Sequence, residues 1–190
     1  TILAARNANV KFYFKNEQIP DRKVSIKSEE YMNIIRYQDG TVFNNNAFIF
    51  NNKGDCTVYS LSNKEKISTF TLDKAAILSP HANAVFFGST YYSDDDTYPL
   101  LYVNIYNNYW TTSDRKEGTC CVYRLLEENG SFKTKLVQVI KIGFVDDLTL
   151  WKSIEGTGDY LPYGNFVIDN DNMKLYSFVL RDYTRTTRFF

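Results

Sequence analysis

The sequence lacks several features that would point directly to a function. Its 190 residues contain one histidine, three cysteines and four prolines. No stretch approaches the about 18 consecutive apolar residues of a membrane-spanning helix, so we expect no membrane partner. Lys and Arg total 22, as do Asp and Glu, giving a formal net charge of zero. The basic excess typical of nucleic-acid-binding proteins is therefore missing, and we expect no nucleic-acid partner.

The cysteines do not suggest a disulfide framework. Cys56, Cys120 and Cys121 are odd in number and two are adjacent, whereas small disulfide-rich domains carry even sets. We expect reduced, buried thiols. This favours a reducing compartment such as the cytoplasm, with a secreted mature chain as the alternative.

Aromatic residues are what the sequence has in excess. Fifteen Tyr, 14 Phe and two Trp make 16% of the chain, and hydrophobic residues make 44%. Aromatic side chains favour strands and large buried contacts. The composition predicts a folded, β-rich protein.

Short apolar or alternating runs separated by turn residues predict antiparallel meanders. The first meander has strands at 47–50, 56–61 and 67–72, with polar turns between them. We expect later strands at 100–106, 120–125, 135–144, 165–168, 174–180 and 187–190. Candidate innermost strands precede each meander, at 31–37, 83–88 and 147–151.

Two of these meanders share residues at equal spacing. The segment 54–61 matches 118–125 in its Gly, Cys, Val, Tyr and Leu, and 175–178 keeps the same shape, with Tyr176 placed opposite Tyr59 and Tyr123. Four-stranded units repeated in this way are typical of β-propeller blades. We predict one all-β domain over 1–190, with a partial or divergent blade at 1–30 and blades at about 31–73, 80–144 and 147–190.

Several stretches resemble a group of uncharacterised β-propeller-like proteins of anaerobic gut bacteria. They are 79–88, 98–109, 118–123, 137–144, 162–167 and 186–190, within a resemblance that covers roughly residues 39–190. The resemblance implies a propeller fold. It carries no activity and no functional residues over to this chain.

The length also bears on this prediction. Three blades are fewer than the four to eight of known propellers, the chain begins without Met, and it ends on Phe189-Phe190 in a predicted outer strand. We therefore expect either a small four-bladed propeller or part of a larger ring. Open blade edges would then self-associate or pair with another chain.

The candidate ligand-binding residues fall into two groups. His81 and Asn83 precede a predicted innermost strand, where propellers often bind ligands, and Asp39 could supply a carboxylate. Tyr109 and Trp110 form a dense aromatic cluster, and Trp151 and Tyr163 lie in a predicted irregular loop over 151–164. Such side chains could contact a sugar or a peptide, although packing between blades also accounts for the aromatic cluster.

No metal or cofactor is predicted. Asp94-Asp95-Asp96 and Asp169-Asn170-Asp171-Asn172 contain oxygen ligands but do not follow a calcium-loop pattern, so we interpret them as a solvated turn and a hairpin turn. There is no Gly-x-Ser-x-Gly motif, and Gly156-Thr157-Gly158-Asp159 is not a phosphate loop.

The sequence favours a non-catalytic module that binds a protein, a small molecule or a carbohydrate. The first alternative is a carbohydrate-active hydrolase or lyase that uses His81 with a channel carboxylate such as Asp39 or Asp159. The second is a structural fragment that completes a larger ring.

Overall fold

The computed structural model describes residues 37–105, 119–141, 160–181 and 186–189, together with four short strands nearer the N-terminus. The chain divides into two compact units, Thr1–Ile34 and Ile35–Phe190. In the first unit, β1 pairs with β4 and β2 with β3, both antiparallel. These strands are β1 Ala8–Val10, β2 Tyr13–Phe14, β3 Glu17–Gln18 and β4 Arg22–Val24.

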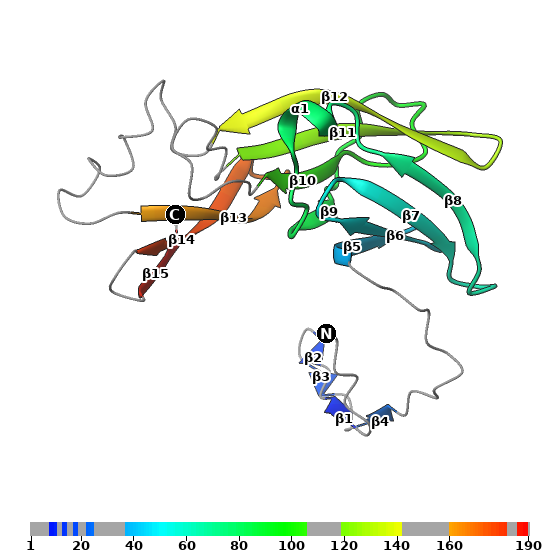
Figure 1. The fold of residues 1–190 in the computed structure, drawn as a ribbon. Coiled ribbons are helices and arrows are strands. Elements are labelled where there is room, and N and C mark those ends of the chain that lie inside the picture. Colours follow the sequence, from blue (N-terminus) through cyan, green and yellow to red (C-terminus); the bar gives the residue numbers. More distant parts are fainter. Residues whose placement is uncertain are drawn as a thin grey trace. The chain divides into compact units, whose positions relative to one another are not determined.

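The second unit contains three antiparallel sheets, each built from strands that are consecutive in the chain (Figure 1). The first comprises β5 Tyr37–Phe43, β6 Asn46–Asn51, β7 Asp55–Ser60 and β8 Lys66–Thr71. The second comprises β9 Val85–Phe87, β10 Leu101–Ile105, β11 Thr119–Glu128 and β12 Ser131–Lys141. The third comprises β13 Tyr160–Asp169, β14 Lys174–Arg181 and β15 Thr186–Phe189.

The fold is all-β with antiparallel sheets, as the composition predicts. The one helix among the described residues is the short α1, Ala75–Leu78, between the first and second sheets. No helix in this part of the chain has the length and apolar character needed to cross a membrane.

The strand that pairs with β6 is β5, Tyr37–Phe43, which the sequence patterns do not predict beyond Tyr37. The rest of the innermost strand predicted at 31–37 lies outside the described residues. Asp39 and Gly40 are poor strand formers, which hides β5 from a propensity argument. Positive φ angles at Asn44 and Asn45 close a tight hairpin that fixes the β5–β6 register.

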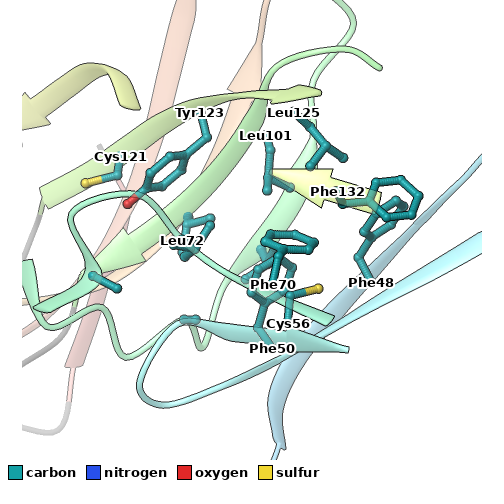
Figure 2. Close-up of a cluster of buried hydrophobic side chains, with 14 of the residues drawn as sticks. Phe48, Phe50, Cys56, Phe70, Leu72, Leu101, Cys121, Tyr123, Leu125 and Phe132 are labelled. Carbon is teal, nitrogen blue, oxygen red and sulfur yellow. The ribbon is translucent and has the colours of Figure 1, made fainter. Parts of the chain in front are cut away.

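The first and second sheets pack face to face. Their shared core is lined by fully buried side chains of β6, β7, β10 and β11, among them Phe48, Val58, Leu101 and Tyr123 (Figure 2). Strand β5 contacts β9, and β8 contacts β12, so the first strands lie together and so do the last strands. The two sheets are therefore stacked in the same order.

The third sheet packs on the opposite face of the second sheet. Phe166 of β13 is buried in a second cluster with Tyr102, Cys120 and Val122. The turn between β13 and β14 adds polar contacts, because Asn170 Oδ1 accepts a hydrogen bond from Ser89 N at 2.8 Å. The second sheet is thus covered on both faces, and all five residues of β10 are buried.

In the first two sheets, residues at matching positions of the predicted repeat lie on matching faces. Cys56 and Val58 face the following sheet in β7, and Cys120 and Val122 do so in β11. Tyr123 faces the preceding sheet, and Tyr59 lies on the corresponding face of β7. Because successive side chains of a strand point to opposite faces, equal spacing in the two strands places the matched residues on the same face of each sheet.

In the third predicted repeat, Tyr176 lies in a strand, as Tyr59 and Tyr123 do, but on the opposite face of its sheet. Leu175 packs toward the second sheet, so its neighbour Tyr176 lies on the opposite side. Because a shift of one residue reverses the face of every side chain, the alignment of Tyr176 with Tyr123 is one residue out of register.

Candidate functional site

The segment that leads into β9 is tightly constrained. Ser79 and Ala82 have φ angles of 48° and 50°, in the left-handed region that residues with a Cβ seldom adopt. Ala82 is fully buried, between His81 and Asn83. Pro80 is also buried, and its ring fits against Gly54, where an added Cβ would lie 2.8 Å from Pro80 Cγ. Strain of this kind persists where surrounding contacts fix the backbone, often at functional sites.

Asn104 organises this segment from β10. Its side chain is fully buried in an otherwise apolar strand. Oδ1 accepts a hydrogen bond from Ala84 N at 2.9 Å, and Nδ2 donates to Asn83 Oδ1. Its backbone N–H also donates to Ala84 O at 3.0 Å. One residue therefore fixes both the backbone at Ala84 and the side chain of Asn83.

Asp39 reaches the same segment from the first sheet. Its Oδ2 accepts a hydrogen bond from Val85 N at 2.7 Å. Strand β9 is at the edge of its sheet, so its N–H groups on the open side need partners from elsewhere. The carboxylate supplies one and joins the first strands of the two sheets. Asp39 and Asn104 thus bind three consecutive residues, Asn83, Ala84 and Val85.

His81 lies at the outer end of this polar segment and is half-buried. Burial lowers its pKa, because desolvation disfavours the imidazolium. The ring is therefore neutral at pH 7, and a neutral imidazole can both donate and accept a hydrogen bond. Asn104 is fully buried, and its side-chain amide is hydrogen-bonded to Ala84 and Asn83. The half-buried His81, Asn83 and Asp39 are the groups of this segment suited to an uncharged, hydroxyl-bearing ligand.

Most of the aromatic candidate residues lie outside the part of the chain that the structure describes. Tyr109, Trp110, Trp151 and Asp159 lie outside the described residues, as does the predicted innermost strand at 147–151. Tyr163 is within β13, so residues 160–164 of the predicted loop are strand, and the loop prediction is wrong there. A register irregularity between Pro162 and Phe166 explains how the strand accommodates Pro and Gly.

The two acidic segments have structural roles. Asp96 accepts three hydrogen bonds from Arg124, two from Nε and one from Nη2, and its side chain is 3% exposed. The Arg124 guanidinium also lies over the Tyr92 ring, 5.0 Å from its centroid. Asp96 is therefore not solvated as the sequence suggests, because Arg124 anchors the loop to β11. In the other segment, Asn172 donates to Asp169 from both its backbone and its side chain, as a hairpin turn requires.

The cysteines are free and buried, as expected. Burial raises the pKa of Cys121 to about 12, and that of Cys56 is raised for the same reason. These thiols are inert rather than nucleophilic. Within the described ranges, no group of three or more His, Cys, Asp or Glu residues is placed to hold a metal ion.

Asn104 is the residue that sequence reasoning missed. A single Asn among Leu101, Tyr102, Val103 and Ile105 is a polar residue in a buried strand, which could have marked it.

No protein-family model matches the chain, and the search of curated proteins finds no similar sequence.

Proposed function

We propose that this chain is a non-catalytic binding module of β-propeller type. The proposed ligand is a small polar molecule rich in hydroxyl groups, such as a carbohydrate, bound at residues 81–85. The observation that carries the proposal is the convergence of Asp39, Asn83 and Asn104 on this segment.

The stacking of the sheets supports the propeller arrangement. In a propeller, blades are four-stranded meanders packed face to face, with their first strands lining the central channel. Here the meanders stack in the same order, and β5 contacts β9. The segment entering β9 would then lie at the channel, where ligands commonly bind.

The chemistry of the segment supports a neutral ligand. Carboxylate, amide and neutral imidazole groups provide both donors and acceptors without a concentration of charge. A hydroxyl-rich molecule can satisfy both kinds of group at once. A strained backbone held by Asn104 would keep these groups in place before the ligand arrives, which lowers the entropic cost of binding.

His81 gives a direct test, because it is the only histidine. Its imidazole signals in ¹H–¹⁵N spectra can be followed while a panel of mono- and oligosaccharides is titrated. We expect at least one sugar to shift these signals in a saturable way, and His81→Ala to weaken that binding about 10-fold. The exposed residue Asn52 provides the control, since Asn52→Ala should bind as wild type. If no sugar perturbs His81, or His81→Ala binds equally well, the proposal is wrong.

A hydrolase or lyase is the second candidate. The observation that favours it is the Asp39 carboxylate held at Val85, four positions along the chain from a neutral His81. Product analysis of the same sugars distinguishes the two functions. Turnover that is lost in both Asp39→Asn and His81→Ala would establish catalysis, whereas binding without product formation supports the module.

A further inference from the structure

Two hydrogen bonds of fixed direction run from the backbone of Ala84 through Asn104 to Asn83. The backbone N–H of Ala84 can only donate, so the side-chain atom of Asn104 that lies 2.9 Å from it is the acceptor Oδ1. The other group of that amide, Nδ2, can only donate, and it donates to Asn83 Oδ1. We call these two bonds the amide relay. One backbone N–H group therefore determines the direction of both bonds.

Burial disfavours the opposite orientation of the amide relay. Asn104 is fully buried, so an NH2 group turned toward Ala84 N would leave two donors facing each other away from water. The backbone N–H of Asn104 also donates to Ala84 O at 3.0 Å, which holds the two residues together. Asn104 thus determines which way round the Asn83 amide lies.

The amide relay leaves Asn83 with a donor group that the protein does not use. Its Oδ1 accepts from Asn104, whereas its Nδ2 donates to no residue in the part of the chain that the structure describes. Asn83 is half-buried, so part of the residue remains open to a ligand. Asp39 has the opposite polarity, because its carboxylate can only accept, and Oδ2 already accepts from Val85 N.

We propose that Asn83 is a specificity-determining residue that donates to an oxygen acceptor of the ligand, and that Asn104 is the positioning residue that sets this direction. The inference rests on the binding function proposed above, and it names the kind of atom required at one point of that site. A hydroxyl, ring or carbonyl oxygen fits Asn83, whereas a group that can only donate does not. At Asp39 the ligand must instead supply a donor, such as a hydroxyl proton.

Solvent exchange of side-chain amides tests the direction of the amide relay without a ligand. The NH2 signals of Asn83, Asn104 and the exposed Asn52 are assigned in ¹H–¹⁵N spectra by substituting each residue in turn. We expect the Asn104 NH2 group to exchange about 100-fold more slowly than that of Asn52, and the Asn83 NH2 group within about 10-fold of Asn52. An Asn83 NH2 group as protected as that of Asn104 would donate inward, which would overturn the proposal.

Exchanging two side chains tests the same direction by stability. In the double variant Asp39→Asn with Asn83→Asp the net charge is unchanged, and both inward bonds can persist. An amide oxygen can accept from Val85 N, and a carboxylate can accept from Asn104 Nδ2. We expect a urea midpoint within about 0.5 M of wild type. A midpoint lowered as far as in Asn104→Leu would mean that a carboxylate faces Asn104 Oδ1, and the proposal would be wrong.

Sugar binding tests the donation to the ligand. The probes are D-glucose, D-galactose, D-mannose and N-acetyl-D-glucosamine, and the His81 imidazole signals report binding separately. At saturation, exchange of the Asn83 NH2 group should slow about 10-fold, while that of Asn52 should not change. A sugar that shifts the His81 signals without slowing exchange at Asn83 would contradict this inference and keep the binding function. If no sugar binds, the binding function is wrong, and the role of Asn83 in specificity is wrong with it.

Discussion

Tyr98 and Tyr123 are both buried, but their hydroxyl groups differ in hydrogen bonding. Tyr98 is 2% exposed, and its hydroxyl donates to Glu127 Oε2 at 2.8 Å and accepts from Asn46 Nδ2 at 3.2 Å. Tyr123 is fully buried, and its hydroxyl lies beside the thiol of Cys121, a weak hydrogen-bonding group, with no stronger partner among the described residues (Figure 2).

Replacing each tyrosine with Phe should therefore have different effects. Tyr98→Phe should lower the free energy of unfolding by about 1–3 kcal/mol, since it removes the hydrogen bonds to the Glu127 carboxylate and the Asn46 amide. Tyr123→Phe should be neutral or stabilising, because it removes a desolvated hydroxyl. Urea denaturation of the two variants measures the difference. Equal losses in both variants would contradict the hydrogen-bond assignment.

Asn104 makes the corresponding prediction for an amide. Asn104→Leu keeps the approximate volume but removes the partners of Ala84 N and Asn83 Oδ1. We expect a loss of about 2–4 kcal/mol in unfolding free energy, against less than about 0.5 kcal/mol for Asn52→Ala. A small loss for Asn104→Leu would show that the segment 83–85 does not depend on this side chain.

The thiols give a chemical prediction at the same scale. With its pKa raised to about 12, Cys121 is almost entirely protonated at pH 8, and burial blocks access to it. Ellman's reagent should therefore modify none of the three cysteines in the native protein at pH 8 and all three in denaturant. Rapid reaction of even one thiol before unfolding would contradict its burial.

Individual residues of the site could be proposed from the sequence, but their partners could not. His81 and Asn83 stand before a recognisable strand, which is local information. The link from Asp39 to Val85 joins residues 46 positions apart, and it depends on two sheets packing together. No pattern within either segment indicates that the two residues are in contact. The sequence could therefore propose Asp39 as a carboxylate but not its hydrogen bond to Val85.

At the scale of elements, the turns determine register, and two glycines allow a controlled comparison. Gly54 and Gly130 have φ angles of 84° and 75°, so alanine is strained at both. An added Cβ meets Pro80 at Gly54 and has nothing within 4 Å at Gly130.

Gly130→Ala should therefore cost about 1 kcal/mol of unfolding free energy, from backbone strain alone. Gly54→Ala should cost about 1–3 kcal/mol more, because the contact with Pro80 must also give way. Thermal or urea unfolding of the two variants measures this difference. If the two losses match, the packing of Pro80 on the β6–β7 turn contributes nothing.

Strands with alternating or apolar runs were predictable, whereas those built from weak strand formers were not. β9, β10 and β14 lie close to their expected positions because their residues favour strands. β5 includes Gln38, Asp39 and Gly40, and it exists because β6 and the second sheet provide partners for it. Tertiary contacts override local preference there.

For the molecule as a whole, buried acids with raised pKa values predict a loss of stability in alkali. Burial is the main cause of a pKa of about 12 for Tyr98 and for Cys121, against 10.0 and 9.0 when unperturbed. Below about pH 8 both groups are protonated in the folded and unfolded states, so their contribution is constant. Between about pH 8 and 12 the unfolded chain releases protons that the native protein retains, first from Cys121 and then from Tyr98, so the free energy of unfolding falls.

Urea denaturation at pH 8, 9, 10 and 11 tests this sign. The midpoint should decrease from about pH 8 upward, and Tyr98→Phe should show a shallower decrease above about pH 9 because one titrating group is gone. A midpoint that is constant or rises over this range would contradict the burial of these groups.

The double coverage of the second sheet has a consequence for the order in which the molecule opens. An array whose units contact only their neighbours loses its end units first, since each of these has a single interface to break. The backbone amides of β10 are protected by both neighbouring sheets, so they should exchange with deuterium last. Amides of β5 and β15 should exchange earlier, through partial openings that leave the central strands intact. The middle sheet would then be the part of the second unit that survives longest as the protein unfolds.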